Sequence, residues 1–217
     1  MTQVPLRNRT MTQRLIETWL PIAALGEESV RERRSMTALP PVYYLHVWWA
    51  RRPLVAARAA LLASLLPADT DRGKFMHVLG IHGDPVASRR RIDEARRKGE
   101  RFEGEAYSYR RAFSYCPTAS EIAWFHDQAA ACAATEPVVL DPTAGGGSIP
   151  FEAIRLGLTA FANDLNPVAS LLIRATVEWP ATLGFDLLAE FKRLAAEFIT
   201  RREERLQPFF PPEPESN

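Results

Sequence analysis

The chain has 217 residues and 47% of them are apolar, so it can bury a hydrophobic core in one domain of ordinary size or in two small ones. Its 27 Lys and Arg against 26 Asp and Glu give a net charge of +1. This excludes the class of polycationic proteins that bind nucleic acid through their overall charge alone. No run of about 18 uncharged apolar residues occurs and the N-terminus lacks the apolar centre of a signal peptide, so we expect a cytoplasmic protein with no membrane partner.

The two cysteines, Cys116 and Cys132, exclude two further classes of small protein. They are too few for a disulfide framework, and a structural zinc site usually needs four ligands. We therefore expect a reducing compartment and no metal.

Residues 1–67 predict a mainly helical N-terminal region. Helical apolar spacing over residues 12–25 is interrupted by Pro21, and the charged run EESVRERR that follows indicates a solvated helix or turn. Next, LPPVYYLHVWWARRP begins as an aromatic, strand-like run. Pro53 then stands at the expected first turn of an Ala- and Leu-rich helix that ends near Pro67.

Residues 68–117 predict an inserted, charged surface segment. Apolar periodicity fades over residues 69–111, where SRRRIDEARRKGERFEGEAYSYRR carries nine Lys and Arg against five Asp and Glu. Arginines interleaved with Tyr107, Tyr109 and Phe113 are compatible with tracking a phosphate backbone. A mixed-charge run is more typical of a solvated helix, which is the interpretation we favour.

Residues 118–206 predict helices around a short pair of strands. Thr118 or Ser120 can cap the first helix, with Glu121 in capping-box spacing from Thr118. Two more helices follow the strands, an apolar one in VASLLIRATVEW and a long amphipathic one in FDLLAEFKRLAAEFITRREERL. Residues 207–217 are proline-rich and predict a disordered tail or linker.

The stretch VVLDPTAGGGSIPFEAIRLGLTAFANDLNP has the order strand, glycine turn, helix, strand, acidic tip. VVL and TAFAN predict the two strands, residues 149–156 the helix, and Gly157 its C-cap. Such a parallel βαβ unit places Gly145 and the next two glycines at the carboxyl edge of the sheet, where helix N–H groups face a ligand. Asp164, about twenty residues downstream, stands where a nucleoside-binding unit needs a carboxylate for the ribose hydroxyls.

Details of the turn narrow the choice of adenosine ligand. No lysine follows the glycines, which excludes a Walker-type phosphate loop, and Pro150 stands where a dinucleotide site has its third glycine. Asp141, at the tip of the first strand, would repel a pyrophosphate but suits the cationic amino group of a methionine moiety and a nearby sulfonium. The turn therefore predicts S-adenosylmethionine.

These residues also carry a family resemblance. DPTAGGGS resembles the DP-F-x-G-x-G-[ST] cofactor motif of amino-methylating DNA methyltransferases, with Thr143 where phenylalanine is usual. Three blocks, RLIETWLPIAALGEESVRERR, LHVWWARRPLVAARAALLASLLP and DPTAGGGSIPFEAIRLGLTAFANDLNPVA, are similar in the same order to the front part of the large adenine-specific DNA methylases that carry a zinc ribbon further on. The blocks cover about half of the chain.

The resemblance implies an α/β class with a partial Rossmann-like S-adenosylmethionine-dependent methyltransferase fold, namely its first βαβ unit after a mainly helical region. It implies DNA as the partner and the exocyclic amino group of adenine as the methyl acceptor. Asp141 and the glycine turn would hold the methionine part, and Asp164 the ribose. The cofactor-binding residues carried over by position are Asp141, Pro142, Thr143, Ala144, Gly145, Gly147, Asp164 and Asn166.

The segment WWARRP has two interpretations, both of which stay open. Trp48 and Trp49 can be core aromatics, with Arg51 and Arg52 as surface charges at a helix start. Alternatively, Arg51 or Arg52 lies beside the cofactor carboxylate or a DNA phosphate, with Trp49 as a further contact.

The chain departs from the family pattern where the chemistry would occur. No [DNS]-P-P-[YFW] loop, which would hold a flipped base, follows the cofactor motif, and LPPVYY has Leu39 in place of the polar residue. The zinc ribbon is absent, and two predicted strands are far fewer than a doubly wound sheet needs. We therefore expect a cofactor-binding portion that is inactive alone, whether truncated, split or a remnant, and assign no catalytic residue. The alternatives are a non-catalytic subunit whose sheet a second polypeptide completes, and methyl transfer to RNA or protein.

Overall fold

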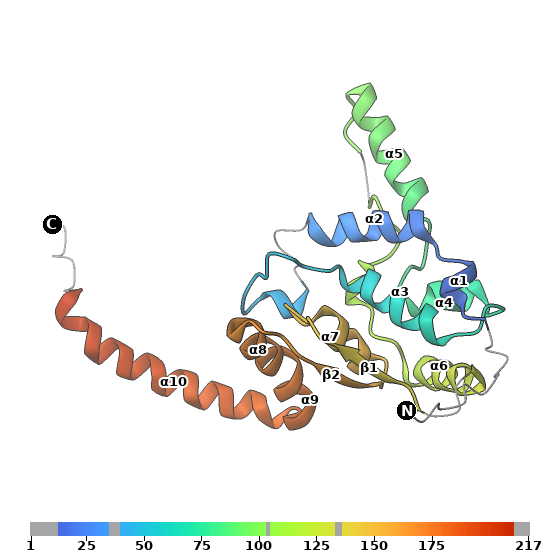
Figure 1. Cartoon of the computed structure of the whole chain (residues 1–217). Helices are drawn as coiled ribbons and strands as arrows, with labels where there is room; N and C mark the ends of the chain where they lie inside the picture. The colour runs from blue at the N-terminus through green and yellow to red at the C-terminus, as the bar shows by residue number, and fades with distance from the viewer. Residues whose placement is uncertain (1–12, 35–39, 103–104, 133–135, 211–217) are drawn as a thin grey trace, which may run out of the picture. The chain divides into compact units, whose positions relative to one another are not determined.

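The structure is a computed structural model that describes residues 13–34, 40–102, 105–132 and 136–210. The chain divides into two compact units, one that runs to Val177 and one that begins at Glu178. Most of the described residues are helical, and they include one small parallel sheet of two strands (Figure 1). No helix in these ranges is both long and apolar enough to cross a membrane.

Several helices precede the sheet. They are α1 (Leu15–Thr18), α2 (Ile22–Arg33), α3 (Leu54–Leu65), α4 (Arg72–Val78), α5 (Pro85–Lys98) and α6 (Ala119–Cys132), with short 3-10 turns η1 (Pro41–Tyr43) and η2 (Ala112–Ser114) among them. As predicted, Pro21 separates α1 from α2. Pro53 is the N-cap of α3, one position before the expected first turn, where its missing N–H costs no helical hydrogen bond.

The strand-like reading of the aromatic run before Pro53 is wrong. Its described part forms η1 and then loop up to Pro53. In a half-buried strand every second side chain is buried. Here Tyr43 and Trp48 are buried five residues apart and in two different apolar clusters, so the run does not follow that pattern.

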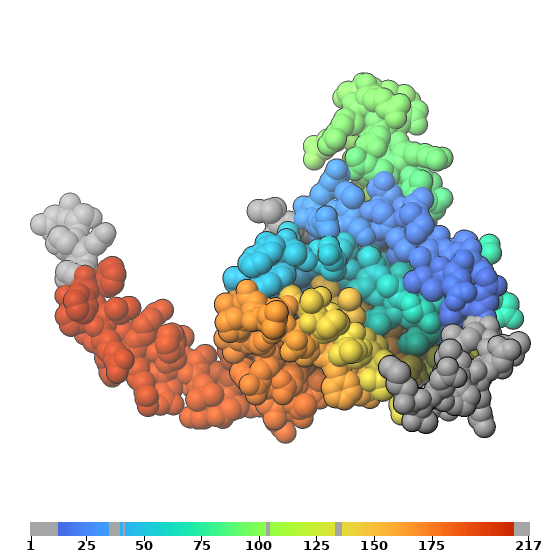
Figure 2. All heavy atoms as spheres, in the orientation of Figure 1, coloured from blue at the N-terminus to red at the C-terminus, as the bar shows by residue number. Residues whose placement is uncertain are grey.

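The expectation that residues 68–117 lie at the surface is wrong for α4 and the turn after it. Phe75, Val78 and Leu79 are fully buried in the main core, so this part of the segment helps to form the fold. The expectation holds for α5, a charged helix that packs on α2 near its start and then projects into solvent (Figures 1 and 2).

Helix α6 begins with the predicted capping box. Thr118 is the capping residue, since its backbone N–H donates to the Glu121 carboxylate at 2.7 Å and its Oγ1 accepts the Glu121 N–H at 3.3 Å. Buried Phe125 then joins α6 to the main core.

The predicted βαβ arrangement is present. Strands β1 (Val138–Asp141) and β2 (Thr159–Ala162) pair in parallel, and α7 (Ser148–Arg155) connects them. Gly157 follows α7 with φ of +72°, a conformation that glycine adopts without strain.

One face of this sheet is covered and the other is open. Val139 and Ala160 pack against the main core, whereas Val138, Leu140 and Phe161 are exposed. Parallel strands are normally covered on both faces, so the open face is unusual for an isolated domain.

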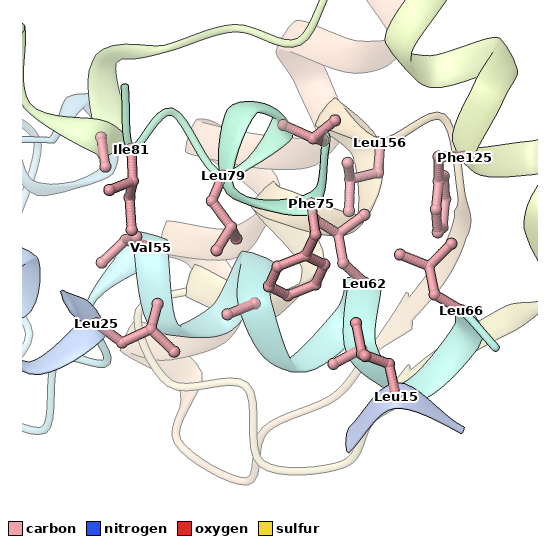
Figure 3. Packing of buried hydrophobic residues seen from close by; sticks show 14 of the residues in the cluster. Leu15, Leu25, Val55, Leu62, Leu66, Phe75, Leu79, Ile81, Phe125 and Leu156 are labelled. Atoms are coloured by element: carbon pink, nitrogen blue, oxygen red, sulfur yellow. The ribbon is translucent and has the colours of Figure 1, made fainter. Parts of the chain in front are cut away.

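Helix α3 runs through the main core (Figure 3). Its Val55 and Leu62 lie among apolar side chains from α1, α2, α4, α6 and the end of α7, including Phe75 and Leu156. Apolar side chains from many elements therefore meet on one helix, which fixes the position of Pro53 and of the residues just before it.

After the sheet, the first unit ends with α8 (Pro167–Ile173) and a π-helical turn, η3 (Arg174–Glu178), that reaches the boundary of the second. The second unit holds α9 (Trp179–Leu183), α10 (Asp186–Leu206) and η4 (Gln207–Phe209). Helix α10 is the predicted long amphipathic helix, and none of its residues is buried. The predicted disordered tail starts within η4, and its residues 211–217 lie outside the described residues.

Candidate functional site

A cavity of about 210 Å³ lies beyond the carboxyl ends of β1 and β2. Its wall combines residues from the strand tips, the glycine turn, the start of α7 and the segment before α3. The lining residues are Tyr43, Trp48, Ala50, Arg51, Arg52, Asp141, Thr143, Ala144, Gly145, Gly146, Ser148, Ile149 and Asp164.

The two predicted carboxylates meet in this cavity. Asp141, the last residue of β1, is buried, and its Oδ1 accepts the Thr143 N–H at 3.2 Å. Asp164 lies two residues beyond β2 and is half-buried. The strands are parallel neighbours, so both acidic tips face the same edge of the sheet, as the sequence predicted.

Asp164 is held by backbone N–H groups on both of its oxygens. Oδ1 accepts the N–H of Asn166 and Oδ2 that of Gly145, each at 2.8 Å. These two hydrogen bonds lower the pKa of Asp164 below its ordinary value, so the carboxylate is ionised at neutral pH. Each oxygen retains a lone pair for a further donor.

The glycine turn is tied to the end of β2. Ala144 donates its N–H to the carbonyl of Asn163 at 2.9 Å, and Asn163 donates to the carbonyl of Asp141 at the same distance. Gly145 has a φ of +53° and Gly147 one of +80°, so both adopt the left-handed conformation that favours glycine. The turn is therefore fixed in place before any ligand binds.

Trp48 is one of several cavity residues that sequence reasoning missed, together with Tyr43, Ala50, Ser148 and Ile149. A Cβ atom on Gly145 would lie 2.7 Å from Trp48 Nε1, and one on Gly146 would lie 3.0 Å from Trp48 Cβ. The indole thus packs directly on the glycine turn. Trp49, a contact only in the second interpretation of WWARRP, does not line the cavity; it is 77% exposed and stacks on Trp48 with ring centroids 4.4 Å apart.

Both arginines of WWARRP line the cavity, as the second interpretation of that segment requires, whereas the burial of Trp48 agrees with the first. The carbonyl of Arg52 accepts hydrogen bonds from the Tyr43 hydroxyl at 3.1 Å and from Ser148 Oγ at 2.9 Å. The guanidinium of Arg51 lies 5.2 Å from the centre of the Tyr43 ring. The segment before α3 is therefore fastened both to η1 and to the start of α7.

Three of the residues carried over by position do not line the cavity. Pro142 is exposed, and Gly147 faces Val177. Asn166 caps α8, since its Oδ1 accepts the Val168 N–H at 2.9 Å. Turn and cap chemistry account for all three.

Glu32, a buried carboxylate on α2, binds the start of α3 directly after the WWARRP segment. Each of its two oxygens lies 3.0 Å from the backbone nitrogen of Leu54, at the start of α3. Burial raises the pKa of Glu32 to about 7. The hydrogen bonds from the N–H groups of Leu54 and Val55 act in the opposite direction and lower it, but burial is the larger effect.

We had predicted that this part of α2 is solvated, and for Glu28 and Glu32 that prediction was wrong. Glu28 and Glu32 lie three and seven residues after buried Leu25, on the same side of α2. This helical spacing was the sequence signal that could have predicted their burial.

The cavity lining combines hydrogen-bond acceptors with cationic donors. Asp141 and Asp164 suit ammonium and hydroxyl groups, and the guanidinium groups of Arg51 and Arg52 suit a carboxylate. Its volume of about 210 Å³ is below the 300–1,000 Å³ that is typical of ligand pockets. Within the described ranges, no group of His, Cys, Asp and Glu side chains is arranged to hold a metal ion.

Residues 19–91 match the model of a family described as a protein of unknown function, DUF1156. The matched part runs from the end of α1 into α5 and includes Tyr43 and Trp48 but not the glycine turn. No curated protein and no solved structure matches the chain.

Proposed function

We propose that this chain is the S-adenosylmethionine-binding portion of a Rossmann-like methyltransferase that acts on the amino group of adenine in DNA, in the family of large adenine-specific DNA methylases that its sequence blocks resemble. The observation that carries the proposal is that Asp141 and Asp164, at the tips of neighbouring parallel strands, line one cavity across a glycine turn. This is where an open α/β sheet binds its ligand.

The cavity residues match the polar groups of the cofactor. Asp141 would bind the amino group of the methionine part, and Arg51 or Arg52 its carboxylate. Asp164, with a free lone pair on each oxygen, would accept hydrogen bonds from the ribose hydroxyls. When bound, the cofactor supplies a methyl group activated by a sulfonium, and the protein needs only to orient it towards the acceptor nitrogen.

The open sheet supports the further proposal that another polypeptide segment completes the enzyme. Val138, Leu140 and Phe161 leave one face of β1 and β2 exposed, and each strand pairs with one neighbour only among the described residues. Because parallel sheets are normally covered on both faces and extended by more strands, we expect a further segment, in this or a second chain, to supply these and the loop for the target base.

The same open face also favours a second candidate, a non-catalytic subunit that docks on a methyltransferase chain. The two candidates differ at the cavity, because a subunit that only docks does not need Asp164 to bind a nucleoside. Methyl transfer to RNA or protein is a variant of the first candidate, since the cavity residues do not contact the acceptor.

Calorimetric titration with S-adenosylhomocysteine, the product form of the cofactor, tests the proposal. We expect the parent chain to bind, and Asp141→Ala and Asp164→Ala each to weaken binding at least about tenfold, because each removes a charge-assisted hydrogen bond. Asp127→Ala, an exposed carboxylate on α6, is the matched control and should bind as the parent does. No heat from the parent, or equal binding by Asp164→Ala, would favour the docking subunit.

A second assay identifies the acceptor. Methyl transfer from labelled cofactor to DNA, RNA and protein is measured with the protein at its natural length and with any chain that copurifies with it. Label in adenine of DNA is the expected result, and label in RNA or protein alone would replace DNA as the substrate.

A further inference from the structure

A basic arm, defined as the described part of residues 85–111, stands out by its charge. It consists of α5 and the segment that returns to η2 (Figure 1). The whole segment has nine Lys and Arg against five Asp and Glu, and eight of the nine cations are arginine. Because the full chain has 27 cations against 26 anions, the remainder of the chain is net negative. Positive charge is therefore concentrated on the arm.

The cations of α5 face solvent in rows. Arg90 and Arg97 are seven residues apart and so lie on one side of the helix, separated by about 10 Å. Arg91 and Lys98 form a second row of the same kind. These four side chains are exposed, and α5 extends beyond α2 on the surface of the first unit (Figure 2).

Several of these cations have no anionic partner in the part of the chain that the structure describes. Arg89 pairs with Asp93 and Lys98 with Glu94, at 2.9 and 3.1 Å. Among the described residues, Arg90, Arg96 and Arg97 have no carboxylate partner. An external anion can therefore bind these exposed guanidinium groups without first breaking an ion pair.

Two concave surfaces lie along the arm and both are lined by cations. One, of about 690 Å³, includes Arg91, Lys98 and Arg101 with Phe102, and also the carboxylates of Glu94 and Glu100. The other, of about 700 Å³, includes Arg110 and Arg111 with Tyr107 and Tyr109. Tyr107 is itself covered by the guanidinium of Arg31, 4.0 Å from its ring centre. The arm thus offers cations together with aromatic rings over an extended surface.

The shape and composition of the arm favour a polyphosphate over other anionic partners. A helix that lies on a membrane has an exposed apolar face, but α5 has no exposed large apolar side chain, and its buried Pro85 and Ser88 lie in the half that packs on α2. A protein interface is usually centred on buried aromatic or aliphatic anchors, which α5 does not offer. Arginine, in contrast, binds phosphate oxygens through two N–H groups at once.

From these observations we propose that the basic arm binds the phosphate backbone of nucleic acid, with Arg90, Arg96 and Arg97 as principal contacts. The surface lies on elements other than those of the cofactor cavity and needs no cofactor. The inference adds a binding surface for the substrate class of the proposed function, and binding at the arm and binding at the cavity are measured separately.

Fluorescence anisotropy with a labelled DNA duplex of arbitrary sequence, and with one of its strands, tests the proposal on the full chain. The parent is expected to bind with an affinity that falls steeply between about 50 and 200 mM salt. The double variant Arg90→Gln/Arg97→Gln should bind about tenfold more weakly at low salt, with a salt slope reduced by about two, because two phosphate contacts are lost. Glu94→Gln, which removes an anion from between those arginines, should bind more tightly than the parent.

The matched control is Lys192→Gln/Arg205→Gln on α10, which removes the same charge from the second unit. It should bind nucleic acid as the parent does. Equal loss in the control, an unchanged arm variant, or no binding by the parent at low salt would overturn the proposal. Binding to anionic phospholipid vesicles is measured in the same way. Tighter binding to the vesicles than to either DNA would assign the surface to membranes instead. Binding of S-adenosylhomocysteine should be the same in the arm variant and the parent, so failure here is distinct from failure at the cavity.

Discussion

Asp164 Oδ2 lies 2.8 Å from the backbone nitrogen of Gly145, so the acidic tip that follows β2 holds the glycine turn that follows β1. The other oxygen accepts the Asn166 N–H. A single carboxylate therefore joins the ends of both strands to the start of α8, and it shapes the cavity as well as lining it.

The first prediction concerns the amide protons held by Asp164. In Asp164→Ala, the N–H groups of Gly145 and Asn166 lose their acceptor, so we expect their exchange with deuterium to accelerate at least about tenfold. Exchange is read residue by residue by NMR. The Ala144 N–H, which donates to the Asn163 carbonyl, is the internal control and should remain protected. Equal acceleration at Ala144 would mean that the whole turn unfolds and that Asp164 acts on it less specifically than the hydrogen bonds indicate.

The second prediction ranks three glycine substitutions. Gly145→Ala combines a φ of +53° with a Cβ atom 2.7 Å from Trp48 Nε1, whereas Gly147→Ala has a φ of +80° and only ordinary contact with Val177. We expect Gly147→Ala to cost about 1 kcal/mol of unfolding free energy and Gly145→Ala at least about 2 kcal/mol. Gly26→Ala, within α2 and with no atom within 4 Å of the added Cβ, should stabilise the protein by about 1 kcal/mol.

Thermal and urea unfolding measure this order. Adding Trp48→Leu to Gly145→Ala should recover part of the loss, because the contact with the indole nitrogen is removed. Equal costs for Gly145→Ala and Gly147→Ala would show that the left-handed backbone alone, and not Trp48, makes glycine necessary at the turn.

Signals for the βαβ unit are local, which is why the sequence alone predicts it. Branched residues in VVL indicate a strand, consecutive glycines a turn, and Gly157 the end of a helix, and each of these signals acts within a few residues of its own position. The predicted burial of that strand is wrong for Val138 and Leu140, which are exposed. Once the strands are parallel neighbours, Asp141 and Asp164 must lie at the same edge. Their meeting in one cavity follows from the topology, not from long-range packing.

The missed features depend on partners far away in the chain. Arg58 pairs with Glu152 across 94 positions, and Glu32 binds the start of another helix. Charged residues are normally exposed, so the only local signals are weak ones: Glu32 continues the buried side of α2, and Arg58 is the sole charged residue in α3. The choice between Trp48 and Trp49 was open for another reason. They lie in a loop, which has no periodicity to say which side chain points inward.

The third prediction is a pH dependence set by Glu32. Its pKa in the folded protein is about 7 against 4.5 ordinarily, so folding favours the protonated form. The resulting stability is fully present below pH 4.5 and is lost as pH rises through 7. This corresponds to up to about 3 kcal/mol of unfolding free energy.

Glu32→Gln isolates this effect, because the amide is neutral at every pH and keeps one acceptor oxygen for the Leu54 N–H. Urea unfolding at a series of pH values should show the parent losing stability relative to the variant between pH 4.5 and 8. Glu17→Gln, at an exposed position in α1, should track the parent throughout. A parent-to-variant difference that is constant with pH would contradict the prediction.

The fourth prediction concerns the fully buried ion pair that joins α3 to α7. Arg58 Nε lies 2.7 Å from Glu152 Oε2, and neither side chain is exposed. Glu152 has a second partner in Arg155 at 2.9 Å, whereas the other hydrogen bonds of Arg58 to described residues go to the carbonyls of Val78 and Leu79. The two residues therefore depend on each other unequally.

From this asymmetry we expect Glu152→Met to be the more damaging single substitution, because it leaves a buried guanidinium without a carboxylate and should cost about 3–5 kcal/mol. Arg58→Met should cost less, since Arg155 still compensates Glu152. The double variant Arg58→Met/Glu152→Met should be less destabilised than the sum of the single variants, because no uncompensated charge remains in the core. Urea unfolding followed by circular dichroism gives all three values. If Arg58→Met were instead the worse of the two, Arg155 would not be able to replace Arg58 as the partner of Glu152.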